Sequence, residues 1–213
     1  MARRLKNLEG HTLRGRLLKR SLGKDWTGQI AFVGVYGVGR NTLCERFGRL
    51  SEGDIKRRER RAYRELIIDH SKVRTKYANQ GKTCLTMHVI FPQDGVERDY
   101  NKIAEKLNGI VLMIDLNEDE TELVFAKQLL AKLMTSCEDQ PPCILVGNKK
   151  DICIAVDRSY EGNYRVRNYY KGGEEMASSI GAERYFECSA KKGLFCFPLA
   201  VYVLENFIQN PEP

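Results

Sequence analysis

Short, uniformly apolar runs alternate with helical patterns along most of this chain. Such runs are expected to be strands buried on both faces of a sheet, and they occupy residues 29–33, 109–115, 143–147 and 184–188. Helical spacing of apolar residues predicts helices at 41–50, 123–133 and 199–208. This rhythm predicts an α/β domain with a doubly wound, mostly parallel sheet, in which ligands bind beyond the carboxyl ends of the strands.

The basic surplus of the chain is confined to its N-terminal segment. The 213 residues include 35 Lys and Arg against 28 Asp and Glu, a formal net charge of +7. Residues 1–24 hold eight of the basic residues and one acid, Glu9, so the rest of the chain is neutral. A neutral folded domain argues against a nucleic-acid partner. We therefore expect a basic, flexible extension at 1–25 and one folded domain at 26–210.

The cysteines and histidines predict neither a disulfide framework nor a metal site. The seven cysteines contain no C-x-x-C pair, and several lie in apolar runs, where a reduced thiol packs as a small hydrophobe. His11, His70 and His88 are scattered, without the spacing of metal ligands. A cytoplasmic location is expected. The leucine and arginine pattern of residues 1–24 leaves open a peripheral contact with an anionic membrane, or a mitochondrial presequence.

A glycine-rich turn follows the first strand and opens the first helix. In the phosphate-binding pattern G-x-x-x-x-G-K-S/T, backbone N–H groups wrap the phosphates, the lysine reaches them and the hydroxyl holds magnesium. Arginine and asparagine occupy the last two positions here. Arginine keeps the charge in a wider fork, whereas asparagine is a weaker magnesium ligand, so the magnesium site is in doubt. The predicted phosphate-binding residues are Gly34, Tyr36, Gly37, Val38, Gly39, Arg40 and Asn41.

Two later motifs follow the ends of predicted strands. Asn148-Lys149-Lys150-Asp151 comes after the run at 143–147, and Ser189-Ala190-Lys191 comes after the last strand. In order and spacing these motifs resemble the guanine-recognition elements of the Ras superfamily of small GTPases. The resemblance implies a three-layer P-loop small-GTPase fold, with a mostly parallel six-stranded sheet flanked by helices. It implies GTP or GDP as ligand, with Asn148, Lys149 and Asp151 on the guanine and Ser189, Ala190 and Lys191 closing over the base.

The carboxyl half resembles the Rho family within that superfamily, which identifies the chain as a divergent Rho-like member. The similar stretches are 144–151 and 173–191, and 37 residues separate Asp151 from Ser189. That spacing implies a Rho-type insert region at 152–171, as a helix or as a loop. Rho-like proteins usually reach membranes through a prenylated tail, and the C-terminal residues contain no C-a-a-X box. Residues 1–24 are therefore a candidate replacement for that anchor.

The resemblance fails where a GTPase performs its chemistry. The family pattern D-T-A-G-Q is replaced by residues 91–98, which place Pro92 at the aspartate and Val96 at the glutamine. Neither side chain can hold magnesium or orient the hydrolytic water. The threonine position of switch I falls near Ile67 or Ile68, and the nearest threonine is Thr75. We assign no catalytic residue and no metal ligand.

Three interpretations of the function stay open. The first is an atypical Rho-like G protein that binds GTP or GDP, hydrolyses GTP slowly or not at all, and contacts protein partners through a switch-like surface. The second is a nucleotide-free pseudoGTPase scaffold, because Asn148 and Ser189 could brace the loops. The third is an active GTPase with a rearranged switch II that uses Gln93 or Asp94. The basic run at 56–64 stands where the family has the early part of switch I. It is interpreted either as a solvated charged face or as a contact for an acidic partner or an anionic lipid.

Overall fold

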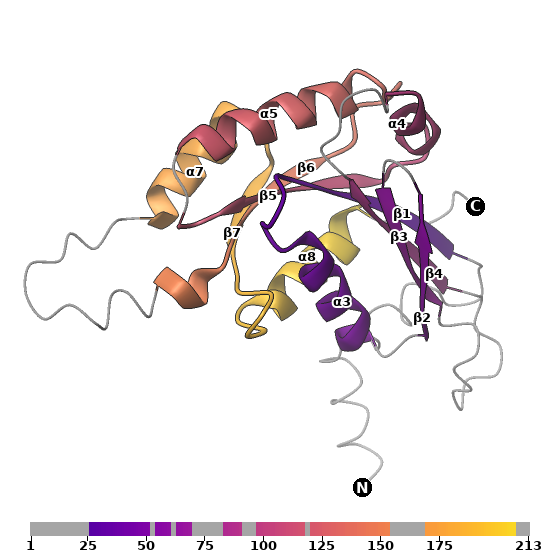
Figure 1. Ribbon diagram of the computed structural model, residues 1–213, viewed down its shortest axis with the longest axis horizontal. Helices are drawn as coiled ribbons and strands as arrows, with labels where there is room; N and C mark the ends of the chain where they lie inside the picture. Colours follow the sequence, from indigo (N-terminus) through magenta and orange to yellow (C-terminus); the bar gives the residue numbers. More distant parts are fainter. Residues whose placement is uncertain are drawn as a thin grey trace, which may run out of the picture.

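A computed structural model describes residues 26–51, 54–60, 63–69, 83–90, 97–117, 120–153 and 169–207 of the chain. Strands and helices alternate from β4 (Thr83–Ile90) onward as the sequence predicts, whereas three strands, the last of which is β4, follow one another up to that point (Figure 1). In chain order the elements are β1 (Trp26–Val33), α3 (Arg40–Ser51), β2 (Asp54–Glu59), β3 (Tyr63–Asp69), β4 (Thr83–Ile90), α4 (Glu97–Ala104), β5 (Gly109–Asp115), α5 (Glu120–Met134), β6 (Cys143–Asn148), α7 (Tyr169–Ser179), β7 (Arg184–Glu187) and α8 (Cys196–Phe207).

The strands form one seven-stranded sheet in the order β2-β3-β4-β1-β5-β6-β7. The five strands from β4 to β7 in that order are parallel, whereas β3 is antiparallel to β4 and β2 is antiparallel to β3. The predicted α/β class and mostly parallel sheet are confirmed. Because the parallel strands point the same way, the segments that follow β1, β5, β6 and β7 meet at one edge of the sheet.

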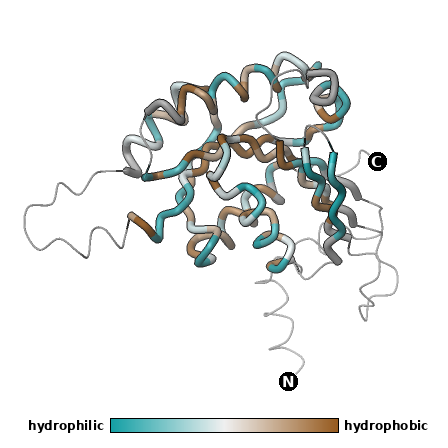
Figure 2. The backbone as a smooth tube through the Cα atoms, viewed as in Figure 1, coloured by the Kyte–Doolittle hydropathy of each residue, from teal (hydrophilic) through white to brown (hydrophobic). Residues whose placement is uncertain are grey.

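Helices cover both faces of the sheet, so the domain has the predicted three layers. Figure 1 shows α4, α5 and α7 above the strands and α3 and α8 below them. Alternate residues of each strand enter the two cores, as Phe32 and Ala31 of β1 do. Phe32 packs edge-on against Phe47 of α3, with ring centroids 5.8 Å apart. Figure 2 shows the resulting hydrophobic strands between more polar helices, which is why the strand runs are uniformly apolar.

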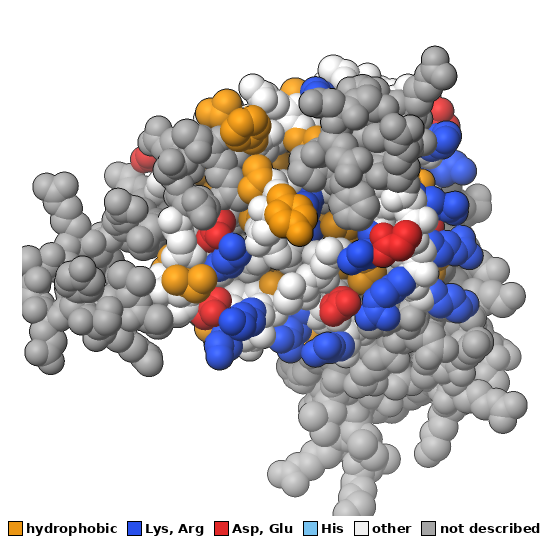
Figure 3. Space-filling view, viewed as in Figure 1, with side chains coloured by type: hydrophobic (Ala, Val, Ile, Leu, Met, Phe, Trp, Pro, Cys, Tyr) orange, Lys and Arg blue, Asp and Glu red, His pale blue; other side chains and the backbone are white. Residues whose placement is uncertain are grey.

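The prediction of six strands is wrong, because the basic run contributes a strand of its own. Residues Asp54–Glu59 form β2, which pairs with β3 at the outer edge of the sheet. A turn closed by the bond from the Arg60 N–H to the Tyr63 carbonyl, 2.9 Å, joins the two strands. Lys56, Arg57 and Arg58 are exposed, and Figure 3 shows Lys and Arg side chains along this side of the molecule. Charged edges of this kind hinder unwanted strand pairing.

Several predictions concern residues that the structure describes only in part or not at all. The extension at 1–25 and the switch II residues Pro92, Gln93, Asp94 and Val96 lie outside the described residues, as do Thr75, His11 and His70. The insert region at 152–171 is described only at its two ends, where Ile152 and Cys153 continue a short helical turn and Tyr169 begins α7. These predictions stay predictions.

The expected switch I position near Ile67 or Ile68 is wrong. Both residues lie inside β3, where Ile67 is opposite Thr86 and Ile68 is opposite Leu85. Ile90 is the last residue of β4 and so lies at the carboxyl edge of the sheet, and its partner there is Tyr63, the first residue of β3. The segment that approaches this edge between α3 and β3 is therefore the turn after β2, several residues earlier in the chain.

His88 and the cysteines belong to the interior. His88 is buried on β4, where its Nε2 lies 2.9 Å from Oε1 of Gln29 and its ring meets Tyr63 edge-on. Burial lowers the pKa of His88 to about 4, so the ring is neutral at physiological pH. Six cysteines have described side chains, all of them free thiols, and five of these are buried. Burial raises the pKa of Cys143 to about 12, as expected of a thiol that packs and does not react.

Candidate functional site

The glycine-rich turn between β1 and α3 lies at the carboxyl edge of the sheet. A Cβ on Gly34 would lie 2.5 Å from the Met113 carbonyl oxygen, and one on Gly39 would lie 2.4 Å from Nδ2 of Asn148. Only glycine fits at either position, and Gly39 also has a φ of +97°. Tyr36, at the tip of the turn, is 92% exposed. The turn therefore presents its backbone and the N-terminus of α3 outward, an arrangement suited to phosphate.

Arg40 extends from the turn toward a neighbouring strand. It is 6% exposed, and its Nη1 donates a hydrogen bond to the carbonyl of Ile90 at the end of β4. Its guanidinium thus lies between the carboxyl ends of β1 and β4, which are adjacent strands. One of its five N–H donors is engaged by Ile90. Arg40, which was predicted to contact phosphate, therefore has a hydrogen-bond partner within the chain, the Ile90 carbonyl.

Asn41 has a buried acceptor whose partner is missing from the described structure. Its Oδ1 is buried and has no hydrogen-bond partner among the described residues. Buried polar oxygens nearly always have a partner, so this oxygen is a candidate acceptor for a water molecule or a candidate ligand for an ion. It lies on the first turn of α3, directly after Arg40, where the phosphate-binding pattern places a magnesium ligand. An amide oxygen is chemically suited to magnesium, although it carries no charge.

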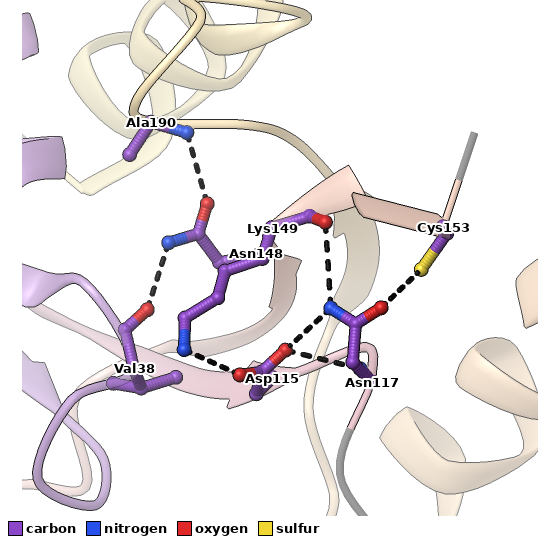
Figure 4. Close-up of polar contacts among 7 residues, drawn as sticks. All are labelled: Val38, Asp115, Asn117, Asn148, Lys149, Cys153 and Ala190. Atoms are coloured by element: carbon purple, nitrogen blue, oxygen red, sulfur yellow. Dashed lines mark hydrogen bonds and ion pairs between the residues drawn. The ribbon is translucent and has the colours of Figure 1, made fainter. Parts of the chain in front are cut away.

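Asn148 connects the two sides of the site (Figure 4). Its Nδ2 donates to the Val38 carbonyl at 2.7 Å, and its Oδ1 accepts from the Ala190 N–H at 2.9 Å. The Cys188 thiol also lies 3.5 Å from Oδ1. This buried side chain therefore fastens the glycine-rich turn to the loop after β7. Its hydrogen bonds are made to the chain, so its role in the structure is to hold the two loops together.

Lys149 is held by a carboxylate that the sequence analysis did not single out. Its Nζ lies 2.5 Å from Oδ2 of Asp115, and its backbone adopts a φ of +64°. Asn117 donates to Oδ1 of Asp115 from its backbone N–H at 3.0 Å and from Nδ2 at 2.8 Å. Burial alone would raise the pKa of Asp115, but the hydrogen bonds from Lys149 and Asn117 outweigh it and lower that pKa.

Asp151 and Ser189 form the third contact of the site. The Ser189 hydroxyl donates to Oδ1 of Asp151 at 2.5 Å and accepts from the Lys192 N–H at 3.1 Å. Oδ2 of Asp151 has no hydrogen-bond partner within the described part of the chain. From α3, Arg46 donates to the carbonyls of Ala190 at 3.2 Å and Lys191 at 2.9 Å. Asp151 therefore has a fixed orientation and an oxygen available for a donor on a ligand.

The fold thus brings all three predicted motifs to one edge of the sheet. A model of the Ras family matches residues 29–196, which include the glycine-rich turn and both later motifs. The chain belongs to the Ras family. Ras-family proteins are GTP-binding small G proteins with a P-loop fold, so the predicted superfamily, fold and guanine-nucleotide ligand are confirmed at the level of the family. No curated protein matches the chain.

Within this Ras-family site, sequence reasoning missed Asp115 and Asn117. A signal for Asp115 was present, because it is the one charged residue in the otherwise apolar run at 109–115. A carboxylate at the carboxyl end of a buried parallel strand lies where ligands of such sheets bind. Asn117 carried no such signal, since its role depends on contacts with Asp115 and with the Cys153 thiol, 3.3 Å from its Oδ1.

In the described part of this Ras-family chain, no helix is long and apolar enough to cross a bilayer.

Proposed function

We propose that this Ras-family protein is an atypical, Rho-like G protein that binds guanine nucleotide and hydrolyses GTP slowly or not at all. The observation that carries the proposal is the path of the chain after α3. In this protein that segment pairs with the sheet as β2 and returns through a short turn at Arg60. The guanine side of the site keeps its motif residues, whereas the phosphate side has been rebuilt.

The rebuilt segment contains no residue able to replace the switch I threonine. Between the end of α3 and the start of β3, residues 52–62 include neither serine nor threonine. Thr75 belongs to the connection from β3 to β4, whose flanking residues Asp69 and Cys84 pair at the edge opposite the glycine-rich turn. The segment between α3 and β3 therefore provides no side-chain hydroxyl to contact both magnesium and the terminal phosphate. This supports impaired hydrolysis.

For binding, each motif has a task that its geometry supports. The N–H groups of the glycine-rich turn and of the first turn of α3 would surround the phosphates. Asp151, oriented by Ser189, would accept hydrogen bonds from the guanine ring N–H and amino group, which adenine cannot supply in that pattern. The Ala190 segment, fixed by Asn148 and Arg46, would close over the base. Guanine specificity then depends mainly on Asp151.

Magnesium fits this site weakly. Its role in such proteins is to neutralise charge on the β- and γ-phosphates. Among the described residues, Oδ1 of Asn41 is a candidate ligand, and it is a neutral oxygen where the pattern has a hydroxyl. We infer that the nucleotide is held chiefly by backbone N–H groups and by Asp151, with a small contribution from magnesium.

Titration with a fluorescent GTP analogue tests the proposal. The wild-type protein should bind the GTP analogue, and Asp151→Asn should lose guanine preference and gain relative affinity for a xanthine nucleotide. Single-turnover hydrolysis of bound GTP should be close to the uncatalysed rate. Rapid hydrolysis that is abolished by changing Asp94 or Gln93 would establish the third interpretation, an active GTPase with a rearranged switch II.

A nucleotide-free scaffold is the second candidate, and a specific observation favours it. Two cations predicted to meet the nucleotide have partners within the chain: Arg40 is bonded to the Ile90 carbonyl and Lys149 to Asp115. Acid release of bound small molecules from the purified protein, followed by chromatography, separates the candidates. Stoichiometric guanine nucleotide supports the G protein, whereas none, together with no binding in the titration, supports the scaffold.

A further inference from the structure

A cavity of about 650 Å3 runs along the free edge of the sheet at β7. All four residues of β7 line it, and Phe197, Pro198, Val201 and Tyr202 of α8 form the opposite wall. In the sheet order β7 is the last strand, so it has a strand neighbour, β6, on one side (Figure 1). A groove beside an open strand edge can accept an extended peptide as an additional strand.

The walls of this β7 groove are aromatic. The Phe186 ring on β7 and the Tyr202 ring on α8 lie 5.1 Å apart, between centroids. The Arg184 guanidinium lies over both rings, 5.9 Å from Phe186 and 5.3 Å from Tyr202. Pockets that combine apolar walls with a few polar groups are typical of specific binding sites. The groove is thus suited to a large apolar side chain.

The charges of the β7 groove favour an acidic group on the partner. Lys150 is paired with Glu187, so these two charges compensate each other. Arg184 has no carboxylate partner among the described residues, and its contacts are with the two rings. A guanidinium stacked on aromatic rings still presents its N–H groups at the edge, where a carboxylate can accept two of them. The residues that line the groove therefore carry one positive charge in excess, Lys150 and Arg184 against Glu187. The Glu183 carboxylate lies outside the lining and accepts a hydrogen bond from the Tyr202 hydroxyl at 3.4 Å.

Phe195 provides an independent reason to regard the groove as functional. It lies at the rim with its ring 57% exposed, and Nζ of Lys150 is 5.5 Å from the ring centroid. Its φ is +56°, a conformation that costs a bulky residue about 1 kcal/mol and that glycine adopts freely. An exposed ring gains little from core burial, so the fold alone does not account for phenylalanine at this position.

We propose that the β7 groove binds an extended, acidic segment of a partner protein. The segment would pair with the free edge of β7, place a large apolar side chain between Phe195 and Tyr202, and set a carboxylate against Arg184. Of the motif that follows β6, Lys150 lines the groove, whereas Asn148, Lys149 and Asp151 do not, so a peptide in the groove would leave the predicted guanine contacts uncovered.

The test begins with a phage-displayed library of random 12-residue peptides, selected against the full chain. The selected peptides should share a large apolar residue and at least one Asp or Glu. Fluorescence anisotropy of a labelled consensus peptide should show affinity about tenfold weaker for Phe195→Gly and for Arg184→Glu, as for hot-spot residues. Replacing the acid of the peptide by lysine should restore binding to Arg184→Glu. Methylating one of the two alternating sets of backbone nitrogens should abolish binding and methylating the other should not, because an added strand turns every second N–H toward β7.

Two controls separate binding from folding. Arg58→Glu makes the same change of charge on β2, at the opposite edge of the sheet, and should leave the peptide affinity unchanged. Phe195→Gly should unfold at the same denaturant concentration as the wild type or a higher one. Failure to select any peptide, or equal binding by wild type and Phe195→Gly, overturns the proposal. Dimerisation of the free protein that is lost in Arg184→Glu would also overturn it, since a second copy would then fill the groove.

Discussion

At the residue scale, Asp115 changes the surroundings of a motif lysine. Its carboxylate is 5% exposed and the Lys149 side chain is 32% exposed, so their ion pair is partly shielded from water. Removing one partner of such a pair leaves the other charge without compensation. Asp115→Asn should lower the free energy of unfolding by about 1.5 kcal/mol at neutral pH, the usual size for a hydrogen bond to a charged group. Urea denaturation followed by circular dichroism measures this loss.

The loss should depend on pH in a defined direction. Because the pKa of Asp115 is lowered in the folded protein, its contribution is present above the unfolded pKa of about 4 and disappears as pH falls through the folded pKa. Wild type and Asp115→Asn should therefore converge in stability once the pH falls below the lowered pKa of folded Asp115. Asp139→Asn is a matched control on an exposed loop residue and should change little. A difference that stayed constant with pH would show that the pair does not stabilise the fold.

Asn41 is the residue through which we expect magnesium to affect nucleotide binding. Its Oδ1 is buried without a hydrogen-bond partner among the described residues, and a neutral amide binds magnesium weakly. Adding EDTA should therefore hardly change the dissociation rate of a fluorescent guanine nucleotide from the wild type. Asn41→Ser restores the hydroxyl of the phosphate-binding pattern. This variant should bind more tightly in magnesium than in EDTA.

Asn41→Ala is the control for that experiment, since it removes the oxygen without providing a hydroxyl. It should resemble the wild type in EDTA and show no response to magnesium. Rapid release of nucleotide from the wild type on adding EDTA would contradict the prediction. It would mean that a working metal site includes residues near Pro92, outside the described residues.

At the element scale, the proposed rebuilding of the phosphate side depends on β2. The hydrogen bond from the Arg60 N–H to the Tyr63 carbonyl makes Arg60 and Tyr63 a hydrogen-bonded pair. Along two antiparallel strands, hydrogen-bonded pairs alternate with non-hydrogen-bonded pairs. Arg58, opposite Glu65, should then direct its N–H toward β3, whereas Arg57 directs its N–H outward. Arg58→Pro should cost about 3 kcal/mol of stability and Arg57→Pro clearly less.

Hydrogen exchange and urea denaturation of both proline variants check the prediction. Arg57 also forms an exposed ion pair with Glu45, 3.2 Å, which contributes less than about 1 kcal/mol. Arg57→Ala measures that contribution separately. Equal and small effects of the two prolines would mean that Asp54–Glu59 does not pair with β3 in solution, and the argument for a rebuilt switch I would fail.

The sequence predicts some elements of the fold better than others. Gly34, Gly39 and Asn148 were predicted because their roles depend on short motifs at strand ends. The strand β2 could not be predicted, because its run of charges resembles a solvated segment and its pairing with β3 is a tertiary contact. The Arg40 bond to Ile90 was missed for the same reason, since it joins residues 50 positions apart. Asp115 could be recognised as the charged residue of an apolar run, but its ion pair could not be predicted, because its partner Lys149 is 34 positions later in the chain.

At the scale of the whole molecule, the two edges of the sheet differ in chemistry. The β2 edge is basic and exposed, whereas the β7 edge borders an aromatic groove. The nucleotide motifs lie at the ends of strands between these edges. We therefore expect that each edge can contact a different partner without covering the site.

Membrane contact is the last property that we predict, and it concerns residues 1–24. Their surplus of positive charge accounts for the whole net charge of the chain. Each Lys or Arg near an anionic bilayer contributes about 1 kcal/mol, and salt screens the attraction. The intact chain should therefore sediment with phosphatidylserine vesicles at low salt and dissociate at high salt. A chain that lacks residues 1–24 should stay in the supernatant.

The β2 edge offers a second basic surface, so it must be tested in parallel. Lys56→Glu combined with Arg58→Glu reverses two exposed charges there and leaves residues 1–24 intact. If the N-terminal segment is the anchor, this variant should bind vesicles as the wild type does, because residues 1–24 alone carry the surplus of positive charge. If the deletion binds as well as the intact chain while the β2 variant does not, the membrane surface is the sheet edge. If both variants bind as the wild type does, residues 1–24 are a solvated tail.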